Sequence, residues 1–213
     1  MDPFPLTEGL NPQQLEAVTH AGSPLLIVAG AGSGKTAVLT RRIAYLMRNR
    51  GVAPWEILAI TFTNKAATEM KERVGQLVGP VAERMWVSTF HSICVRILRQ
   101  NAQLVPGLNT NFTIYDGDDA RRLLTMIAKD MQLDLKKYTA RVLANQISNH
   151  KNELVSPADA LAEAEKTKNP FEITVARVFD EYQRRLRAAN SVDFDDLIGE
   201  AVSYTHLTLP TKR

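Results

Sequence analysis

The first half of the chain alternates short apolar runs with longer segments whose apolar residues recur every three to four positions. The apolar runs are residues 24–30 (PLLIVAG), 56–62 (EILAITF) and 85–89 (MWVST). A continuous apolar run of this length is typical of a buried strand in a parallel sheet. The segments after these runs have helical spacing and begin near Lys35, Asn64 and Phe90. Strands that alternate with helices predict an α/β fold with a parallel sheet.

Local capping signals mark two further features of this half. Asn11 is a good N-cap residue and Pro12 suits the first helical position, so a first helix is predicted over LNPQQLEAVTH. We expect Asn64 to cap the helix that carries Ala67 and Met70 on its apolar face.

The pattern becomes mainly helical after about Asn111. One more short strand is predicted over FTIY, and two apolar stripes at helical spacing run from Ala120 to Met131 and from Val175 to Leu186. A helical subdomain is therefore inserted in, or appended to, the α/β domain. The expected division is an α/β domain over 1–111, a helical subdomain over 112–192 and a return to the α/β domain over 193–201.

Composition restricts the class of protein. The 213 residues are 45% hydrophobic and 23% charged, which is typical of a globular protein. No run of eighteen apolar residues predicts a membrane span, and the N-terminus lacks the pattern of a secretory signal. Cys94 is the only cysteine, which excludes a disulfide framework and favours a small buried hydrophobe in a reducing, cytoplasmic setting. The net charge of +3 weakly favours a polyanionic partner.

The stretch AGAGSGKT predicts a phosphate-binding loop. Glycines at three of its positions let backbone N–H groups turn toward phosphate oxygens, and the loop opens onto a helix N-terminus. Lys35 would reach the β- and γ-phosphates, and the hydroxyl of Thr36 would ligate Mg²⁺, which makes these two the candidate catalytic residues. The alternative is a glycine-rich turn. The predicted cradle consists of Ala29, Gly30, Ala31, Gly32, Ser33, Gly34, Lys35 and Thr36.

The expected nucleotide is ATP. A GTPase would need an Asn-Lys-x-Asp motif to bind guanine. The nearest match is TNKAA, in which Asn64 and Lys65 are followed by Ala66 and Ala67, so the carboxylate is missing.

Five ordered stretches together resemble UvrD/Rep/PcrA-type superfamily-one DNA helicases. They are LNPQQLEAV, AGAGSGKT, AITFTNKAATEMKERV, VSTFHSICVRILR and DFDDL. The resemblance implies a RecA-like P-loop NTPase sheet with a helical subdomain. It also implies ATP hydrolysis coupled to 3′-to-5′ movement on single-stranded DNA, with duplex–single-strand junctions as substrates. The chain would be the N-terminal RecA-like domain with most of its helical insertion.

The resemblance also assigns roles to residues. Gln14 would hydrogen-bond the adenine edge, a task that suits an amide because it both donates and accepts. Phe62 would stack on a DNA base, although a core phenylalanine is the alternative. His91 alone is weak evidence for a DNA contact, because a histidine in such a position more often caps a helix or is buried in the core. The residues expected to contact DNA are Thr61, Phe62, Thr63, Asn64, Lys65, Thr89, Phe90 and His91.

Three acidic segments are candidates for a metal site or for the Asp-Glu pair that ATP hydrolysis needs. In SVDFDDL, we favour helix capping over metal binding. In VFDEYQ, helical spacing places Asp180 and Glu181 on the outer face of a helix, and in FTIYDGDD, Gly117 replaces the required glutamate. The genuine pair is therefore expected beyond Glu200.

The last stretch, VSYTHLTLPTKR, resembles the translation of a sequencing-library adaptor, so residues 202–213 are expected to be a non-native tail. A divergent strand is the alternative. We expect the chain to be a fragment of a longer helicase. Because it lacks the Asp-Glu pair and a second RecA-like domain, we expect it not to hydrolyse ATP by itself.

Three other functions remain open from the sequence. The chain could belong to a RecB/AddA-like helicase–nuclease, to a P-loop kinase for a small metabolite, or to a nucleic-acid-binding module without catalysis. The sequence does not distinguish DNA repair from replication, and it identifies no protein partner.

Overall fold

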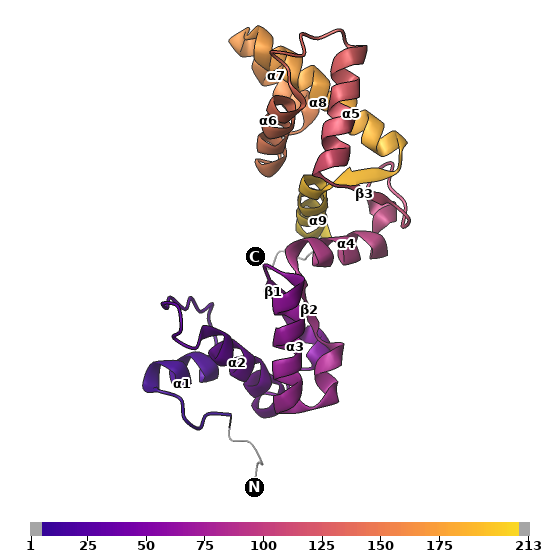
Figure 1. The fold of residues 1–213 in the computed structure, drawn as a ribbon. Helices are drawn as coiled ribbons and strands as arrows, with labels where there is room; N and C mark the ends of the chain where they lie inside the picture. The colour runs from indigo at the N-terminus through magenta and orange to yellow at the C-terminus, as the bar shows by residue number, and fades with distance from the viewer. Residues whose placement is uncertain (1–5, 209–213) are drawn as a thin grey trace. The chain divides into compact units, whose positions relative to one another are not determined.

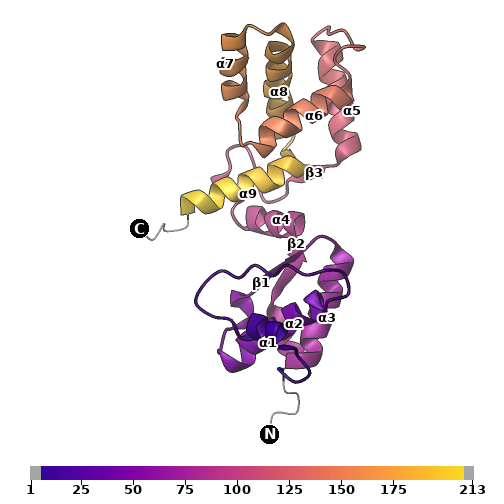
Figure 2. The ribbon, with the colours of Figure 1, turned by 90° about the vertical axis from the view of Figure 1, so that its left-hand side faces the viewer.

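The computed structural model describes residues 6–208, with only the backbone described from 204 to 208. The chain forms two compact units, Met1–Ile93 and Cys94–Arg213, which we describe separately (Figures 1 and 2). Both units combine helices with a short parallel sheet, so the predicted α/β class is confirmed.

The first unit contains a two-stranded parallel sheet flanked by helices. Strands β1 and β2 pair in register from Leu58 opposite Trp86 to Thr61 opposite Thr89, and α3 is the crossover between them (Figure 1). The elements are α1 (Pro12–Thr19), α2 (Lys35–Asn49), the 3-10 turn η1 (Pro54–Glu56), β1 (Leu58–Thr61), α3 (Asn64–Val78), the 3-10 turn η2 (Pro80–Arg84), β2 (Trp86–Thr89) and the start of α4 (Phe90–Gln100).

Two apolar clusters hold these elements together. The larger one packs α2 and α3 against the sheet, and consists of Ile43, Ile57, Ala59, Met70, Val74, Ala82 and Met85. The smaller one joins α1 to α2 through Ala17, Val18 and Val38. In α3 the buried residues Ala67, Met70 and Val74 are spaced by three and four positions, so the periodic pattern correctly identified the buried face of this helix.

The local capping signals are confirmed at α1 and differ by one residue at α3. The Asn11 side chain accepts a hydrogen bond from the backbone N–H of Gln14, and Pro12 occupies the first helical turn. At α3 the cap is Thr63, whose hydroxyl accepts from the N–H of Ala66, and Asn64 is the first helical residue. The prediction that Asn64 caps this helix is therefore wrong.

The predicted strand over residues 24–30 does not form. This segment has no regular secondary structure, and the side chains of Leu26 and Val28 are 86% and 87% exposed. A buried parallel strand requires neighbours that pair with its backbone and cover both its faces. Among the described residues, no strand pairs with this segment, so its apolar side chains remain in water.

The second unit is mainly helical around a second parallel pair. Strands β3 and β4 pair from Thr113 opposite Ser191 to Tyr115 opposite Asp193, and α7 runs beside α8 (Figure 2). The elements are the rest of α4, the 3-10 turn η3 (Ala102–Leu104), β3 (Thr113–Tyr115), α5 (Gly117–Asp130), α6 (Ala140–Asn152), α7 (Pro157–Thr167), α8 (Pro170–Ala188), β4 (Ser191–Asp193) and α9 (Phe194–Thr208).

The core of this unit follows the two predicted helical stripes. Its largest fully buried side chains include Leu124, Ile127, Phe179 and Leu186. Cys94 packs in a neighbouring cluster, and burial raises the pKa of its thiol, as expected for a small hydrophobe.

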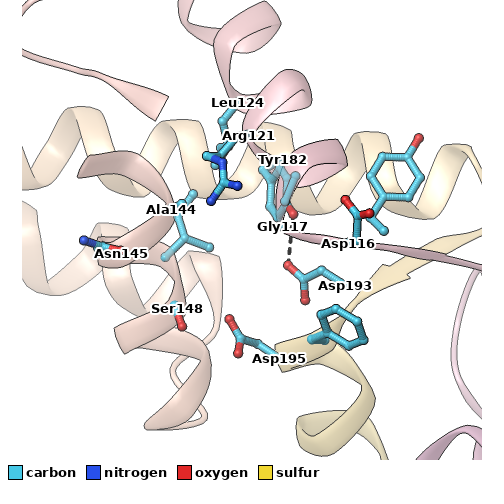
Figure 3. Close-up of a pocket in the computed structure, with 14 residues that line it drawn as sticks. Asp116, Gly117, Arg121, Leu124, Ala144, Asn145, Ser148, Tyr182, Asp193 and Asp195 are labelled. Carbon is cyan, nitrogen blue, oxygen red and sulfur yellow. Dashed lines mark hydrogen bonds between the residues drawn. The ribbon is translucent and has the colours of Figure 1, made fainter. Parts of the chain in front are cut away.

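The DFDDL stretch forms a capping box reinforced by a buried ion pair. The Asp193 carboxylate accepts from the backbone N–H of Asp196 at 2.9 Å, which confirms the predicted capping role. The ammonium of Lys151 lies 2.6 Å from Asp193 and 2.9 Å from Asp196. The Tyr182 hydroxyl donates to Asp193 at 3.0 Å (Figure 3). Burial raises the pKa of Tyr182, so this hydroxyl remains a donor. No sequence pattern identified Lys151 as the partner of these carboxylates.

A cavity of about 260 Å³ lies beside this ion pair (Figure 3). Arg121, Ser148 and Asp195 contribute polar groups to its wall. Among the described residues, no cluster of histidine, cysteine and carboxylate side chains has the arrangement of a metal site.

The two segments that imitate an Asp-Glu pair have structural roles. Asp180 and Glu181 lie within α8, and Glu181 pairs with Arg184 and Arg185, which confirms the helical interpretation. Asp116 follows β3 and caps α5, because its carboxylate accepts from the N–H groups of Asp118 and Asp119.

The suspected tail begins within α9. The backbone of residues 202–208 is helical, so the alternative of a strand there is wrong. Residues 209–213 lie outside the described part, and the proposed origin of the tail stays a prediction.

Candidate functional site

The predicted phosphate loop has the backbone geometry that its glycines allow. Gly32 and Gly34 have φ angles of 76° and 83°, in the left-handed region that a side chain rarely adopts. Gly34 is the N-cap residue of the fifteen-residue helix α2, so the loop meets a helix N-terminus directly. The Ser33 hydroxyl donates to the Gly30 carbonyl at 2.7 Å and closes the turn. The loop therefore has the shape of an anion-binding turn.

Lys35 places a cation over this turn. Its ammonium donates to the carbonyl oxygens of Ala29 at 2.6 Å and Gly30 at 2.5 Å. These carbonyls are weak partners compared with a phosphate, which carries full negative charge. Thr36 is exposed in the first turn of α2, next to the lysine. The exposed Lys35 ammonium and the N-terminus of α2 fit the oxygens of a triphosphate, and the exposed Thr36 hydroxyl fits its divalent cation.

Gln14 is held against the phosphate loop by two hydrogen bonds. Its side-chain oxygen accepts from the backbone N–H of Asn11 at 3.1 Å, and its side-chain nitrogen donates to the Ser33 carbonyl at 3.2 Å. These contacts fix which end of the amide is oxygen and which is nitrogen. One N–H and one lone pair remain available on the same amide. Such a neighbouring donor and acceptor can pair with one edge of a purine base.

A cavity of about 280 Å³ lies between α1 and the loop. Gln14, Ser33 and Lys35 line it together with the polar residues Asn11 and Gln13, so the base-binding candidate and the phosphate-binding candidate share one cavity. Its apolar lining includes Ala29 of the predicted cradle and four residues that the sequence did not indicate as functional, namely Ala17, Ile27, Val28 and Val38.

A second group of predicted residues gathers at one end of the sheet in the same unit. Thr61 and Thr89 are the last paired residues of β1 and β2, so Phe62 and Phe90 follow from adjacent positions on neighbouring strands. Phe62 is 97% exposed, which excludes the alternative of a core phenylalanine in this structure. Phe90 is about half exposed. Two exposed aromatic residues therefore follow neighbouring strands at the carboxyl edge, where parallel sheets bind ligands.

The polar residues of this edge divide into bonded and exposed groups. The hydroxyls of Thr61, Thr63 and Thr89 already bond within their own turns, to the Thr63 carbonyl, the Ala66 N–H and the Ser92 hydroxyl. Asn64 and Lys65 are exposed in the first turn of α3, and His91 is exposed in the first turn of α4. Two helix N-termini and an exposed lysine at one sheet edge give a surface suited to phosphate oxygens.

Comparison with known proteins identifies the family. Residues 10–210 match the model of the UvrD/REP helicase N-terminal domain. The chain belongs to the UvrD/REP helicase family. The resemblance drawn from five ordered motifs is thereby confirmed.

Two relatives in this family illustrate the extent of the match. The chain is 67% identical over 198 residues to ATP-dependent DNA helicase UvrD1 of Mycobacterium tuberculosis, and that alignment covers 93% of the chain and 26% of the relative. It is 51% identical over 193 residues to ATP-dependent DNA helicase PcrA of Bacillus subtilis, covering 91% of the chain and 26% of the relative. The chain thus spans about a quarter of the length of these UvrD/REP relatives.

The described helices of this UvrD/REP chain also bear on membrane association. Among residues 6–208, no helix combines the length and apolar character that crossing a bilayer requires.

Proposed function

We propose that the full-length protein is an ATP-dependent DNA helicase that moves 3′ to 5′ on single-stranded DNA and acts at duplex–single-strand junctions. The chain would contribute the first RecA-like domain and a helical subdomain. The family assignment and the names of the relatives, which are ATP-dependent DNA helicases, support this proposal. The residues of the first unit support it independently, because they combine a nucleotide pocket with an aromatic sheet edge.

Each residue of the nucleotide pocket has a distinct proposed task. Lys35 would exchange the carbonyls of Ala29 and Gly30 for the β- and γ-phosphates, and the backbone amides of the loop would hold the remaining oxygens. Thr36 would offer its hydroxyl to Mg²⁺. Gln14 would pair its free N–H and lone pair with the adenine edge. ATP hydrolysis would supply the free energy for movement.

The proposed DNA path follows the carboxyl edge of β1 and β2. Phe62 and Phe90 would stack on bases, while Asn64, Lys65 and the N–H groups at the start of α3 would bind backbone phosphates. Stacking tolerates any base because every base has a π-face, which suits a protein that moves along DNA of any sequence.

One observation carries the proposal: the two candidate sites lie at the starts of two helices that share a core. Lys35 begins α2, and Phe62 lies just before α3. Ile43 of α2 packs in the same cluster as Met70 and Val74 of α3. A shift of α2 on nucleotide binding would therefore be transmitted by direct packing to the helix beside Phe62.

The test is DNA-stimulated ATP turnover by the full-length protein with Lys35→Ala. We expect turnover to fall to background while the circular dichroism spectrum is unchanged. Lys129→Ala, which removes an exposed lysine in α5, is the matched control and should keep wild-type turnover. Undiminished turnover by Lys35→Ala would defeat the assignment of the phosphate loop.

A further inference from the structure

Two consecutive arginines on α2 bind backbone carbonyls on either side of α1: Arg41 binds the segment that precedes the helix, and Arg42 binds its C-terminal end. The Arg41 guanidinium donates to the carbonyls of Glu8 at 2.6 Å and Leu6 at 3.4 Å, before α1 begins. The Arg42 guanidinium donates to three carbonyls where α1 ends, those of Ala17 at 2.9 Å, Val18 at 3.4 Å and His20 at 2.9 Å.

Helix α1 depends on these contacts for its position. It has only eight residues, and a helix of that length is marginal in water without tertiary support. The last carbonyls of a helix lack partners inside the helix, and α1 has no basic residue in its own last turn. Arg42 supplies both the missing donors and a positive charge at the negative end of the helix. The apolar contact with α2 is small, with Ala17, Val18 and Val38 as its buried members.

The arginine contacts and the base-reading candidate belong to the same short helix. Gln14 lies three residues before Ala17, whose carbonyl Arg42 holds. The Gln14 side-chain nitrogen lies 3.2 Å from the Ser33 carbonyl, a distance that a shift of α1 by half an ångström would break. The position of Gln14 relative to the phosphate loop is therefore set by the contacts that hold α1 to α2.

Arg42 also shares a helix with the phosphate-binding lysine. Lys35 and Arg42 are seven residues apart on α2, which places them on the same face two turns apart. Because α2 is one continuous helix, it fixes the spacing between Lys35 and Arg42, and Arg42 in turn anchors the helix that carries Gln14.

We infer that Arg42 is a positioning residue for base selectivity: it anchors the end of α1 and so keeps the Gln14 amide at the correct distance from the phosphate loop. This inference rests on the proposed function, in which Gln14 pairs with adenine. Arg42 does not itself touch the nucleotide in this scheme. Its removal should therefore weaken recognition of the base and leave binding of the triphosphate intact.

The matched ligand pair is ATP and inosine triphosphate, which differ in the group at position 6 of the purine. The amino group of adenine donates to the free lone pair of Gln14, whereas the oxygen of hypoxanthine cannot. One neutral hydrogen bond corresponds to a preference for ATP of about two- to tenfold. Titration calorimetry of this chain with each nucleotide and Mg²⁺ measures that preference.

Three variants separate positioning from general damage. Arg42→Gln removes the guanidinium. Arg42→Lys keeps a cation that can reach some of the three carbonyls that Arg42 binds. Arg84→Gln removes an exposed arginine of η2 and is the charge-matched control. We expect Arg42→Gln to bind the two nucleotides with equal affinity, no tighter than the wild type binds inosine triphosphate. Arg42→Lys should recover part of the preference for ATP, and Arg84→Gln should keep all of it.

Each other outcome overturns a stated part of the scheme. If Arg42→Gln retains the wild-type preference, or if its binding of both nucleotides is weakened by the same factor, the positioning role of Arg42 is wrong. The proposed role of Gln14 is then unaffected. If the wild type shows no preference for ATP, the proposed role of Gln14 fails and the role of Arg42 fails with it. If neither nucleotide binds to the wild type, the nucleotide pocket itself is wrong.

Discussion

The exposed side chain of Phe62 allows a direct test of the proposed DNA path. It is 97% exposed at the end of β1, so Phe62→Ala removes no core packing. The free energy of unfolding should therefore change by less than about 0.5 kcal/mol. Stacking of one base on an aromatic ring contributes about 1–3 kcal/mol, so the substitution should raise the dissociation constant for single-stranded DNA about 5- to 150-fold.

Fluorescence anisotropy with a labelled oligothymidine at fixed salt concentration measures this effect on the chain. Phe62→Trp should bind as well as the wild type, because it retains an aromatic face. Trp55→Ala is the matched control: Trp55 is 62% exposed on η1, which precedes β1, whereas Phe62 follows it. Its loss should leave the dissociation constant unchanged.

Salt dependence separates stacking from charge at the same edge. Phe62→Ala removes no charge, so the slope of log affinity against log salt should stay as in the wild type. Lys65→Ala should reduce the magnitude of that slope by about 0.7, the value for one lost phosphate contact on a single strand. Wild-type affinity in Phe62→Ala, or an equal loss in Trp55→Ala, would refute the stacking role.

Two further predictions concern the second unit. Lys151→Met leaves the carboxylates of Asp193 and Asp196 buried without their cation, so urea denaturation should show a loss of about 3–5 kcal/mol, and a loss under about 1 kcal/mol would contradict the buried pair. Hydrogen bonds from Arg184 and Arg185 lower the pKa of Glu181 from 4.5 to about 2, so this group stabilises the fold fully above pH 4.5 and loses its contribution as the pH falls toward 2. Glu181→Gln should flatten the acid limb of the stability curve, and an unchanged limb would exclude this contribution.

Features governed by local interactions could be predicted from the sequence. The start of α1 was predicted from Asn11 as N-cap and Pro12 at the first helical position, two consecutive residues. The phosphate loop likewise depends on consecutive residues that set the backbone around Gly32 and Gly34. The one-residue error at α3 arose because Thr63 and Asn64 are both good caps, and the sequence contains nothing that decides between them.

The strands show where local reasoning fails. The apolar runs at 24–30 and 56–62 give the same signal, yet only the second forms a strand. The difference lies in their partners: Leu58–Thr61 pairs with Trp86–Thr89, whereas no described strand pairs with residues 24–30. An apolar run reports that a segment can be buried, and only the rest of the sheet decides whether it is.

The contacts that position the candidate site were beyond prediction for a different physical reason. The spacing of Lys35 and Arg42 on one helical face is visible in the sequence, but the groups that Arg42 binds are backbone carbonyls, which every residue possesses. When a charged residue binds a side chain, its partner is of a complementary residue type that can be sought in the sequence, as Asp193 is for Lys151. Backbone carbonyls have no such residue type. In the sequence, an arginine that binds them is therefore indistinguishable from an arginine in solvent, and only the structure places the end of α1 beside Arg42. Residues that position a site through backbone groups are therefore the part of a functional site that only a structure can supply.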